Sequence, residues 1–335
     1  MGLGRTRGSG SPIASFLVSR LLQAVAIVFI VATVVFVLIH LAPGDPFSTA
    51  IDNPNVTEAI RARWRAEYGL DRPVAEQYVR YLASIARGDL GWSFSMQRPV
   101  ASVLADALPN TLLLAGTALL LGFAGGITLG VVQAQRAGTR TDRVLGAVSL
   151  FFYAIPDFWL ALMVMLLLAY WVPIFPVAGA VDPVMYDTWG FAARAADRAR
   201  HLVLPALTLA LLVAAGIARY QRAELLRVLP EEFVRTARAK GVSERRVMLR
   251  HALRNALIPI VSLVGLALPV LFTGAVFVER VFAWPGMGWV VLNAVGTRDY
   301  PLVTAGVIVA AATVALGSLA ADVLYAVVDP RIRDR

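Results

Sequence analysis

The sequence contains several apolar stretches longer than the roughly 18 residues that a helix needs to cross the hydrocarbon core of a bilayer. The first, residues 16–41, contains few polar residues. Charged residues make up only 16% of the chain, against roughly 25% in soluble domains. The sequence therefore predicts an all-α, polytopic membrane protein.

Six spans are predicted, with boundaries at prolines, glycines and clusters of charge that a membrane helix does not continue through. The predicted spans are residues 16–41, 109–133, 145–171, 202–218, 256–278 and 302–328. The long connections are residues 42–108, 172–201, 219–254 and 279–301, and the tails are residues 1–15 and 329–335. An even number of spans places both termini on the same side.

The distribution of charge predicts the orientation. The first 20 residues, 134–146, 219–254 and 329–335 together hold 19 of the 31 basic residues and 7 acidic residues. The opposite connections hold 12 basic and 13 acidic residues. Because basic loops stay in the cytoplasm, we expect both termini to be cytoplasmic and residues 42–108 to be external. The excess of basic residues is explained by their role in orienting the chain during membrane insertion, so no nucleic-acid partner is expected.

Two predicted spans carry small residues at every fourth position. Such a ladder forms a groove that lets another helix backbone approach closely. We therefore expect tightly packed helices. The ladders are formed by Ala118, Gly122, Gly126 and Gly130, and by Ala206, Ala210, Ala214 and Ala218.

Prolines and carboxylates within the spans are candidate functional features. Pro156 should kink the span at 145–171, and Pro269 lies within another span. Asp157 is the lone carboxylate of its span, so it either lines the pathway or accepts a hydrogen bond from backbone freed by the kink. Asp322 is expected to pair with an arginine near the cytoplasmic headgroups.

No metal or cofactor is expected to be bound by this chain. His40, His201 and His251 lie in three separate regions, and the chain has no cysteine. The single lysine, Lys240, follows Ala239, which excludes the Gly-Lys-Ser/Thr of a phosphate-binding loop. ATP is therefore not bound by that route.

Residues 219–254 are too regular for a simple linker. Residues 230–232, Pro-Glu-Glu, are typical of a helix start, because acidic groups favour the positive end of the helix dipole. Gly241 is expected to stop this helix in a left-handed conformation, and Ser243 can cap a second helix over 244–253. This helix-turn-helix is either a solvated surface facing lipid headgroups or a docking element.

The same segment resembles a known family. Residues 231–241, Glu-Glu-Phe-Val-Arg-Thr-Ala-Arg-Ala-Lys-Gly, and the segment that continues to residue 259 resemble the cytoplasmic loop of permease subunits of bacterial ABC importers, in the dipeptide, oligopeptide and nickel branch. The general importer pattern is Glu-Ala-Ala, three residues, Gly, nine residues, Ile-x-Leu-Pro, of which Ala237, Gly241 and Leu253 are kept. Other stretches agree in order and spacing: residues 43–46, 68–71, 88–91, 108–111, 282–288, 298–301 and 329–333.

The resemblance implies a type I importer permease, with an extra first helix before a five-helix core, in the bacterial plasma membrane. The implied partners are a second homologous permease, two cytoplasmic ATPases that hold ATP and Mg, an external substrate-binding protein and the surrounding lipid. Trp284 is expected to be an interfacial aromatic anchor or a contact for the binding protein. The implied ATPase-coupling residues are Glu231, Glu232, Arg235, Thr236, Ala237, Lys240, Gly241, Arg245, Arg246, His251 and Leu253.

The expected function is therefore one half of a translocation pathway for di- or oligopeptides, and not an enzyme. Nickel and glutathione remain alternatives within the family. An ion-coupled secondary carrier would need intramembrane charges and internal repeats. A simple ion channel would need a filter-like segment.

Overall fold

The computed structural model describes residues 12–41 and 71–328. Residues 1–11 of the first predicted tail, the whole of the second tail, residues 42–70 of the first connection and the family residues 43–46, 68–70 and 329–333 lie outside the described residues. The side chains of Pro269 and Asp322 are likewise not described, so their predicted roles stay predictions.

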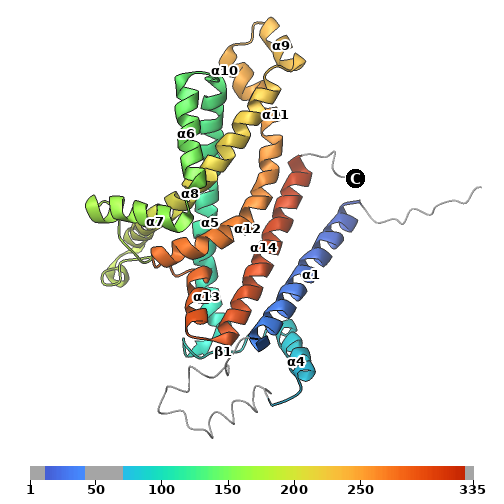
Figure 1. The fold of residues 1–335 in the computed structure, drawn as a ribbon, viewed down its shortest axis with the longest axis vertical. Coiled ribbons are helices and arrows are strands. Elements are labelled where there is room, and N and C mark those ends of the chain that lie inside the picture. The colour runs from blue at the N-terminus through green and yellow to red at the C-terminus, as the bar shows by residue number, and fades with distance from the viewer. Residues whose placement is uncertain (1–11, 42–70, 329–335) are drawn as a thin grey trace, which may run out of the picture.

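Long helices dominate the described part of the chain and lie beside one another (Figure 1). They are α1 (Pro12–Leu41), α5 (Val100–Gln135), α8 (Phe191–Val228), α12 (Ile258–Val281) and α14 (Tyr300–Val328). Among the described residues, four helices are long and apolar enough to cross a membrane, and there are up to six spans if each of two bent helix pairs is taken as one span. The all-α membrane architecture predicted from the apolar stretches is confirmed. In the described residues, β-structure is limited to the antiparallel pair β1 (Trp92–Ser93) and β2 (Arg98–Pro99).

The predicted span at 145–171 is broken rather than kinked. α6 (Arg140–Ala154) and α7 (Asp157–Met165) meet at an angle of 106°, and a π-helical turn, η1 (Leu166–Trp171), follows. Ile155 is extended, with ψ of 136°, because a residue that precedes proline avoids helical geometry. α7 therefore projects sideways from the bundle (Figure 1).

Two helices are longer than their predicted spans. α5 begins at Val100 and contains Pro109, which had been expected to begin the helix. α8 extends beyond the expected span at 202–218 in both directions and contains Pro205. Hydropathy identifies the residues of a helix that can lie in the hydrocarbon core. The helix can extend beyond these residues into water, because its backbone N–H and C=O groups remain hydrogen-bonded within the helix.

The connections also contain structure. Residues 279–301, expected to be a loop, include the end of α12 and a separate helix, α13 (Met287–Gly296). The first connection contains α4 (Val74–Ala86), which starts after Pro73 and ends before Gly88, and the next contains the short η2 (Tyr186–Thr188). α4 packs on α1, where the hydroxyls of Thr33 and Tyr78 are 2.7 Å apart.

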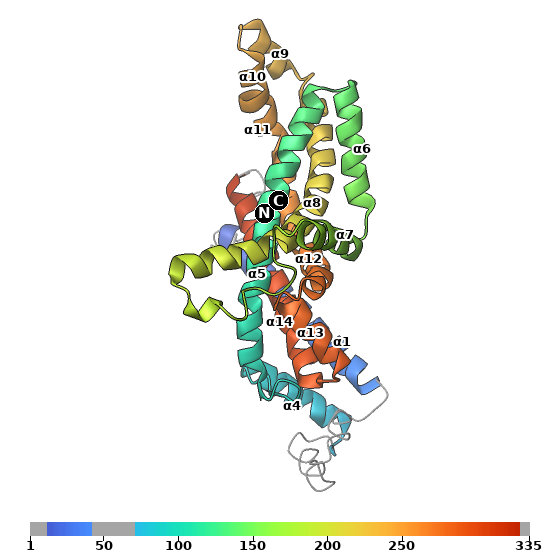
Figure 2. The same cartoon turned by 90° about the vertical axis from the view of Figure 1, so that its left-hand side faces the viewer.

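The two ends of the bundle differ. α9 (Glu232–Ala239) and α10 (Glu244–Arg246) lie at one end, here called the α9 end, and β1, α4 and α13 lie at the other, the α13 end (Figures 1 and 2). α1 begins and α14 finishes toward the α9 end (Figure 1). The first residues of α1 and the last residues of α14 therefore lie on the same side of the bundle (Figure 1).

The two ladders of small residues face each other. A Cβ added at Gly122 would lie 2.7 Å from the Cβ of Val213, and one added at Gly130 would lie 2.6 Å from the Cβ of Gln221. The residue numbers of the contacting positions increase together, from Gly122 with Val213 to Gly130 with Gln221, so α5 and α8 run parallel. Both grooves are filled within this chain, so the ladders do not by themselves indicate a partner subunit. The ladder residues Ala118, Ala206, Ala210 and Ala214 are buried.

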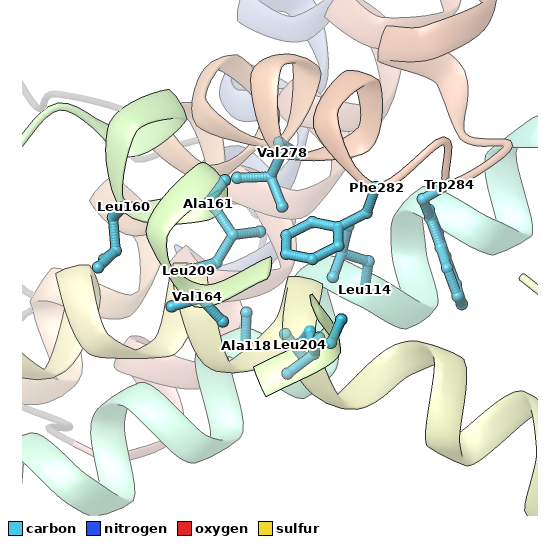
Figure 3. Packing of buried hydrophobic residues seen from close by; sticks show 13 residues of the cluster. Leu114, Ala118, Leu160, Ala161, Val164, Leu204, Leu209, Val278, Phe282 and Trp284 are labelled. Carbon is cyan, nitrogen blue, oxygen red and sulfur yellow. The ribbon is translucent and has the colours of Figure 1, made fainter. Parts of the chain in front are cut away.

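The main apolar core lies beside this helix pair. Side chains from α5, α7, α8 and the end of α12 converge there (Figure 3). Trp284 is fully buried at its edge, so the expectation of an interfacial aromatic anchor was wrong. The indole Nε1–H of Trp284 donates to the carbonyl of Asn110 at 3.0 Å, which satisfies its polar atom inside the protein.

Candidate functional site

The α9 end is built from a chain of short helices that follows α8. α9 is followed by α10, a π-helical segment η3 (Val247–Ala252) and α11 (Leu253–Ala256). The second helix of the predicted pair therefore exists but has π geometry in its middle and continues to Ala256. Ser243 occupies its N-cap position without a side-chain capping bond, so that detail of the prediction was wrong.

Gly241 makes the turn between the two helices. Its φ is +74°, which confirms the left-handed conformation predicted from the sequence. The N–H of Gly241 donates to the carbonyl of Arg238 at 2.9 Å, and the N–H of Val242 donates to the carbonyl of Ala237 at 3.2 Å. This pair of bonds is the Schellman motif, which ends a helix by satisfying its last carbonyls.

α9 is fixed to the bundle through one face. Val234 and Ala237 are buried and join an apolar cluster with Leu225 and Val228 of α8 and Ala134 of α5. Ala237, predicted as a coupling residue, therefore packs inward and is not part of the exposed surface. A movement imposed on α9 must be carried to the ends of α5 and α8, because close-packed groups do not slide freely.

The opposite face is exposed and largely basic. Most predicted coupling residues lie on it: Glu231, Glu232, Arg235, Thr236, Lys240, Gly241, Arg245 and Arg246 are exposed, whereas His251 and Leu253 are half-buried. Phe233 and Leu249 are large apolar side chains that are 43% and 48% exposed here. These two residues were not predicted from the sequence. Phe233 could have been found, because two adjacent apolar residues on a short helix cannot both face the bundle, so one of Phe233 and Val234 must be exposed.

Ion pairs brace this region. Arg238 Nε lies 2.8 Å from Glu244 Oε1 and links α9 to α10 across the Gly241 turn. Arg222 of α8 binds both carboxylate oxygens of Asp142 at 2.8 Å and links α8 to α6. The second pair is half-buried and bidentate, which favours a defined geometry.

A hollow of about 250 Å³ lies at the root of α9, between the ends of α8 and α11 and the start of α12. Its walls combine charged, amide and apolar groups. It is lined by Arg227, Val228, Glu231, Phe233, Asn255, Ile258 and Pro259.

The candidate pathway residues lie elsewhere, at the break between α6 and α7. Pro156 is the N-cap residue of α7, and Asp157 is half-buried in its first turn. The N–H of Phe158 donates to Asp157 Oδ1 at 2.7 Å, so the carboxylate satisfies a backbone donor freed by the break. In the described ranges, no group of three or more His, Cys, Asp or Glu side chains gathers as metal ligands would.

The α13 end holds a buried polar cluster that sequence reasoning missed. Glu279 is fully buried at the end of α12, and the Thr111 hydroxyl of α5 donates to its Oε1 at 2.6 Å. The N–H of Trp289 donates to Glu279 Oε2 at 3.0 Å, and the N–H of Met287 donates to Thr111 Oγ1 at 2.7 Å. Two family stretches, residues 108–111 and 282–288, meet here.

A second buried carboxylate joins the β-hairpin to α14. Asp299 Oδ2 accepts hydrogen bonds from the hydroxyls of Ser93 and Ser95, at 2.6 and 2.7 Å. The N–H of Ser95 also donates to it at 2.9 Å. The family stretch at 298–301 is thereby held against the hairpin.

Comparison with protein-family models accounts for nearly the whole chain. Residues 126–334 match the family described as the inner membrane component of binding-protein-dependent transport systems, and residues 13–115 match its N-terminal part. The chain belongs to this family. It is therefore a multi-pass inner-membrane permease subunit of an ABC importer, works with ATPase and substrate-binding partners and is not itself an enzyme.

Individual relatives align almost end to end. The oligopeptide transport system permease protein AppB of Bacillus subtilis is 37% identical over 95% of this chain and 99% of its own length. The dipeptide transport system permease protein DppB of Escherichia coli is 34% identical over 96% and 99%. The glutathione transport system permease protein GsiC of Escherichia coli is 35% identical over 95% and 99%. The assignment argues against an ion-coupled carrier or a simple ion channel.

Proposed function

We propose that this permease forms half of a translocation pathway for di- or oligopeptides. The observation that carries the proposal is the nearly full-length identity to permeases named for oligopeptide and dipeptide transport. A glutathione permease is similarly related, and glutathione is itself a short peptide. The proposal therefore concerns peptide-like substrates, with nickel as the contrasting outcome.

The test is uptake by the reconstituted importer. The permease would be assembled in proteoliposomes with its second permease, its ATPases and its binding protein, and offered peptides of two to six residues, glutathione and Ni²⁺. We expect ATP-dependent, saturable uptake of a peptide. Uptake of Ni²⁺ alone would contradict the peptide assignment. The chain reconstituted alone should neither hydrolyse ATP nor transport.

We infer that the exposed face of α9, Gly241 and α10 is the surface on which an ATPase subunit docks. The support is the packing of α9: one face is anchored to the bundle in the cluster around Val234, while the other face is exposed and accessible to a partner. Coupling needs a contact whose free energy differs between states of the cycle. A cysteine at Arg235 should cross-link to the ATPase subunit, whereas a cysteine at exposed Arg80 of α4 should not.

We also infer that both termini and the α9 end are cytoplasmic. The support is the excess of basic residues in the segments around α9. The chain has no native cysteine, so single cysteines can be labelled without background. A cysteine at Lys240 should react with an impermeant reagent only from the cytoplasmic side, and one at Arg80 only from outside. The reverse pattern would overturn the orientation.

We further infer that the second permease is a homologous chain. The sideways projection of α7 leaves Phe158, Trp159 and Leu162 exposed in the isolated chain, a surface that suits lipid or a second membrane subunit. Native mass spectrometry of the purified importer should find one copy of this chain with one copy of a different permease. Two copies of this chain would contradict the heterodimer.

A further inference from the structure

α13 lacks a capping side chain of its own. Its N-cap residue is Gly286, so the first N–H groups of the helix have no local acceptor. Two distant residues replace the cap: the N–H of Met287 donates to Thr111 Oγ1, and the N–H of Trp289 donates to Glu279 Oε2. The Thr111 hydroxyl in turn donates to Glu279. Three helices, α5, α12 and α13, are therefore joined by one chain of hydrogen bonds.

The pair is built into the fold at a cost. Glu279 is 0% exposed and Thr111 is 1% exposed, and a buried carboxylate is unfavourable unless donors surround it. A serine or aspartate at the N-cap would satisfy the same N–H groups locally. The remote arrangement instead makes the position of α13 depend on two other helices.

Two glycines make room for the carboxylate. A Cβ at Gly286 would overlap the Glu279 carboxylate and lie 2.5 Å from Thr111 Oγ1, and a Cβ at Gly288 would lie 2.9 Å from Glu279 Oε2 and 2.6 Å from the Cα of Val276. By contrast, a Cβ at Gly296, in the same helix, would meet nothing within 4 Å. The requirement for glycine is therefore confined to the start of α13.

The rest of α13 is held by apolar packing. Met287, Val290 and Ala294 join a buried cluster with Val103 of α5 and Leu302 of α14. Apolar contacts can re-form after a small shift, because they have no fixed direction. The hydrogen bonds at the start of α13 have directional requirements, so they define its position more narrowly.

We propose that Glu279 and Thr111 are a positioning pair that holds α13 at the outer end of the pathway in one state of the transport cycle and releases it in another. The proposal rests on the function and orientation proposed above. A cycle that moves α5 relative to α12 must change this three-helix contact, and a contact that differs between states biases the equilibrium between them.

The test is amide hydrogen exchange over residues 287–290 in the assembled importer, compared between the nucleotide-free state and the state trapped with ADP and vanadate after ATP hydrolysis. We expect the protection of the Trp289 amide to differ by about tenfold or more between the states, as loss of a buried hydrogen bond implies. Equal protection in both states would overturn the proposal. This readout needs no knowledge of the substrate, so it is separate from the peptide assignment.

Variants sharpen the test. Glu279→Gln, Thr111→Val and Gly286→Ala should each lower the protection of the Trp289 amide in the state that holds α13, leave it unchanged in the state that releases α13, and reduce the stimulation of ATPase activity by the loaded binding protein several-fold. Thr111→Ser, which keeps the hydroxyl, and Gly296→Ala should behave as wild type. Unchanged stimulation in all three pair variants at normal abundance would refute the role. If those variants are lost from the membrane, the wild-type exchange comparison alone decides the question.

Discussion

Gly126 offers a direct test of how α5 and α8 pack. A Cβ added there would lie 2.6 Å from the Cβ of Ile217 and 2.8 Å from the carbonyl oxygen of Ala214. Non-bonded carbon atoms prefer separations of about 3.5–4.0 Å. Gly126→Ala therefore forces the two helix backbones apart by about 1 Å, because the nearest atoms belong to the facing helix and cannot rotate away.

The expected loss of stability follows from two opposing contributions. Overpacking by one methyl group costs about 1–3 kcal/mol, and replacing glycine by alanine in a helix returns about 1 kcal/mol. The net destabilisation at Gly126 is then about 0–2 kcal/mol. Gly116 is the matched control, because it lies in the same helix and a Cβ there would meet nothing within 4 Å. Gly116→Ala should be neutral or slightly stabilising.

The measurement is unfolding of the purified chain in mild detergent, followed by tryptophan fluorescence against added denaturing detergent. The order of stability should be Gly116→Ala first, then wild type, then Gly126→Ala, with about 1–3 kcal/mol between the two variants. If Gly126→Ala is as stable as Gly116→Ala, the close approach of α5 and α8 is not what holds this pair together, and the reasoning fails.

Three further predictions concern separate sites. Gly241→Val should lower substrate-stimulated ATPase activity at normal membrane abundance, since a β-branched residue at φ of +74° costs about 1–3 kcal/mol, whereas Gly241→Asn should retain coupling. Asp299→Asn should lower the free energy of unfolding by about 1–3 kcal/mol, measured by thermal denaturation, because one acceptor oxygen is replaced by a donor. Backbone N–H groups of Met185 and Val184 hold the pKa of Asp182 below its usual value, so protection of these amides from exchange should persist at neutral pH and be lost only as the pH falls below about 4.

Much of the fold follows from local sequence. The apolar stretches locate the helices that can span a membrane, and residues 231–241 contain both the acidic start and the glycine stop of α9. The bend at Pro156 is different. Its existence follows from the proline, but its angle of 106° depends on where α7 packs against α8 and α12, which local sequence does not encode.

The cluster around Glu279 shows why sequence reasoning misses some sites. Thr111 and Glu279 belong to stretches far apart in the chain, and each stretch is consistent with an ordinary turn or helix end. Glu279 lies just beyond the predicted span at 256–278, so it was assigned to a loop, where an acidic residue needs no explanation. Only the packing of α5 against α12 shows that it is buried.

The parallel pair of α5 and α8 connects the two ends of the molecule. At the α9 end, Ala134 of α5 and Leu225 of α8 both pack against the cluster that holds α9. At the α13 end, Thr111 of α5 helps to cap α13, and Arg198 of α8 donates to Asn110 of α5. Between these ends the glycine ladder leaves no room for the two helices to approach further. Because α5 and α8 are closely packed, a displacement of α9 would move the two helices together. Thr111 lies at the other end of α5, so this movement would act directly on the hydrogen bonds that hold α13.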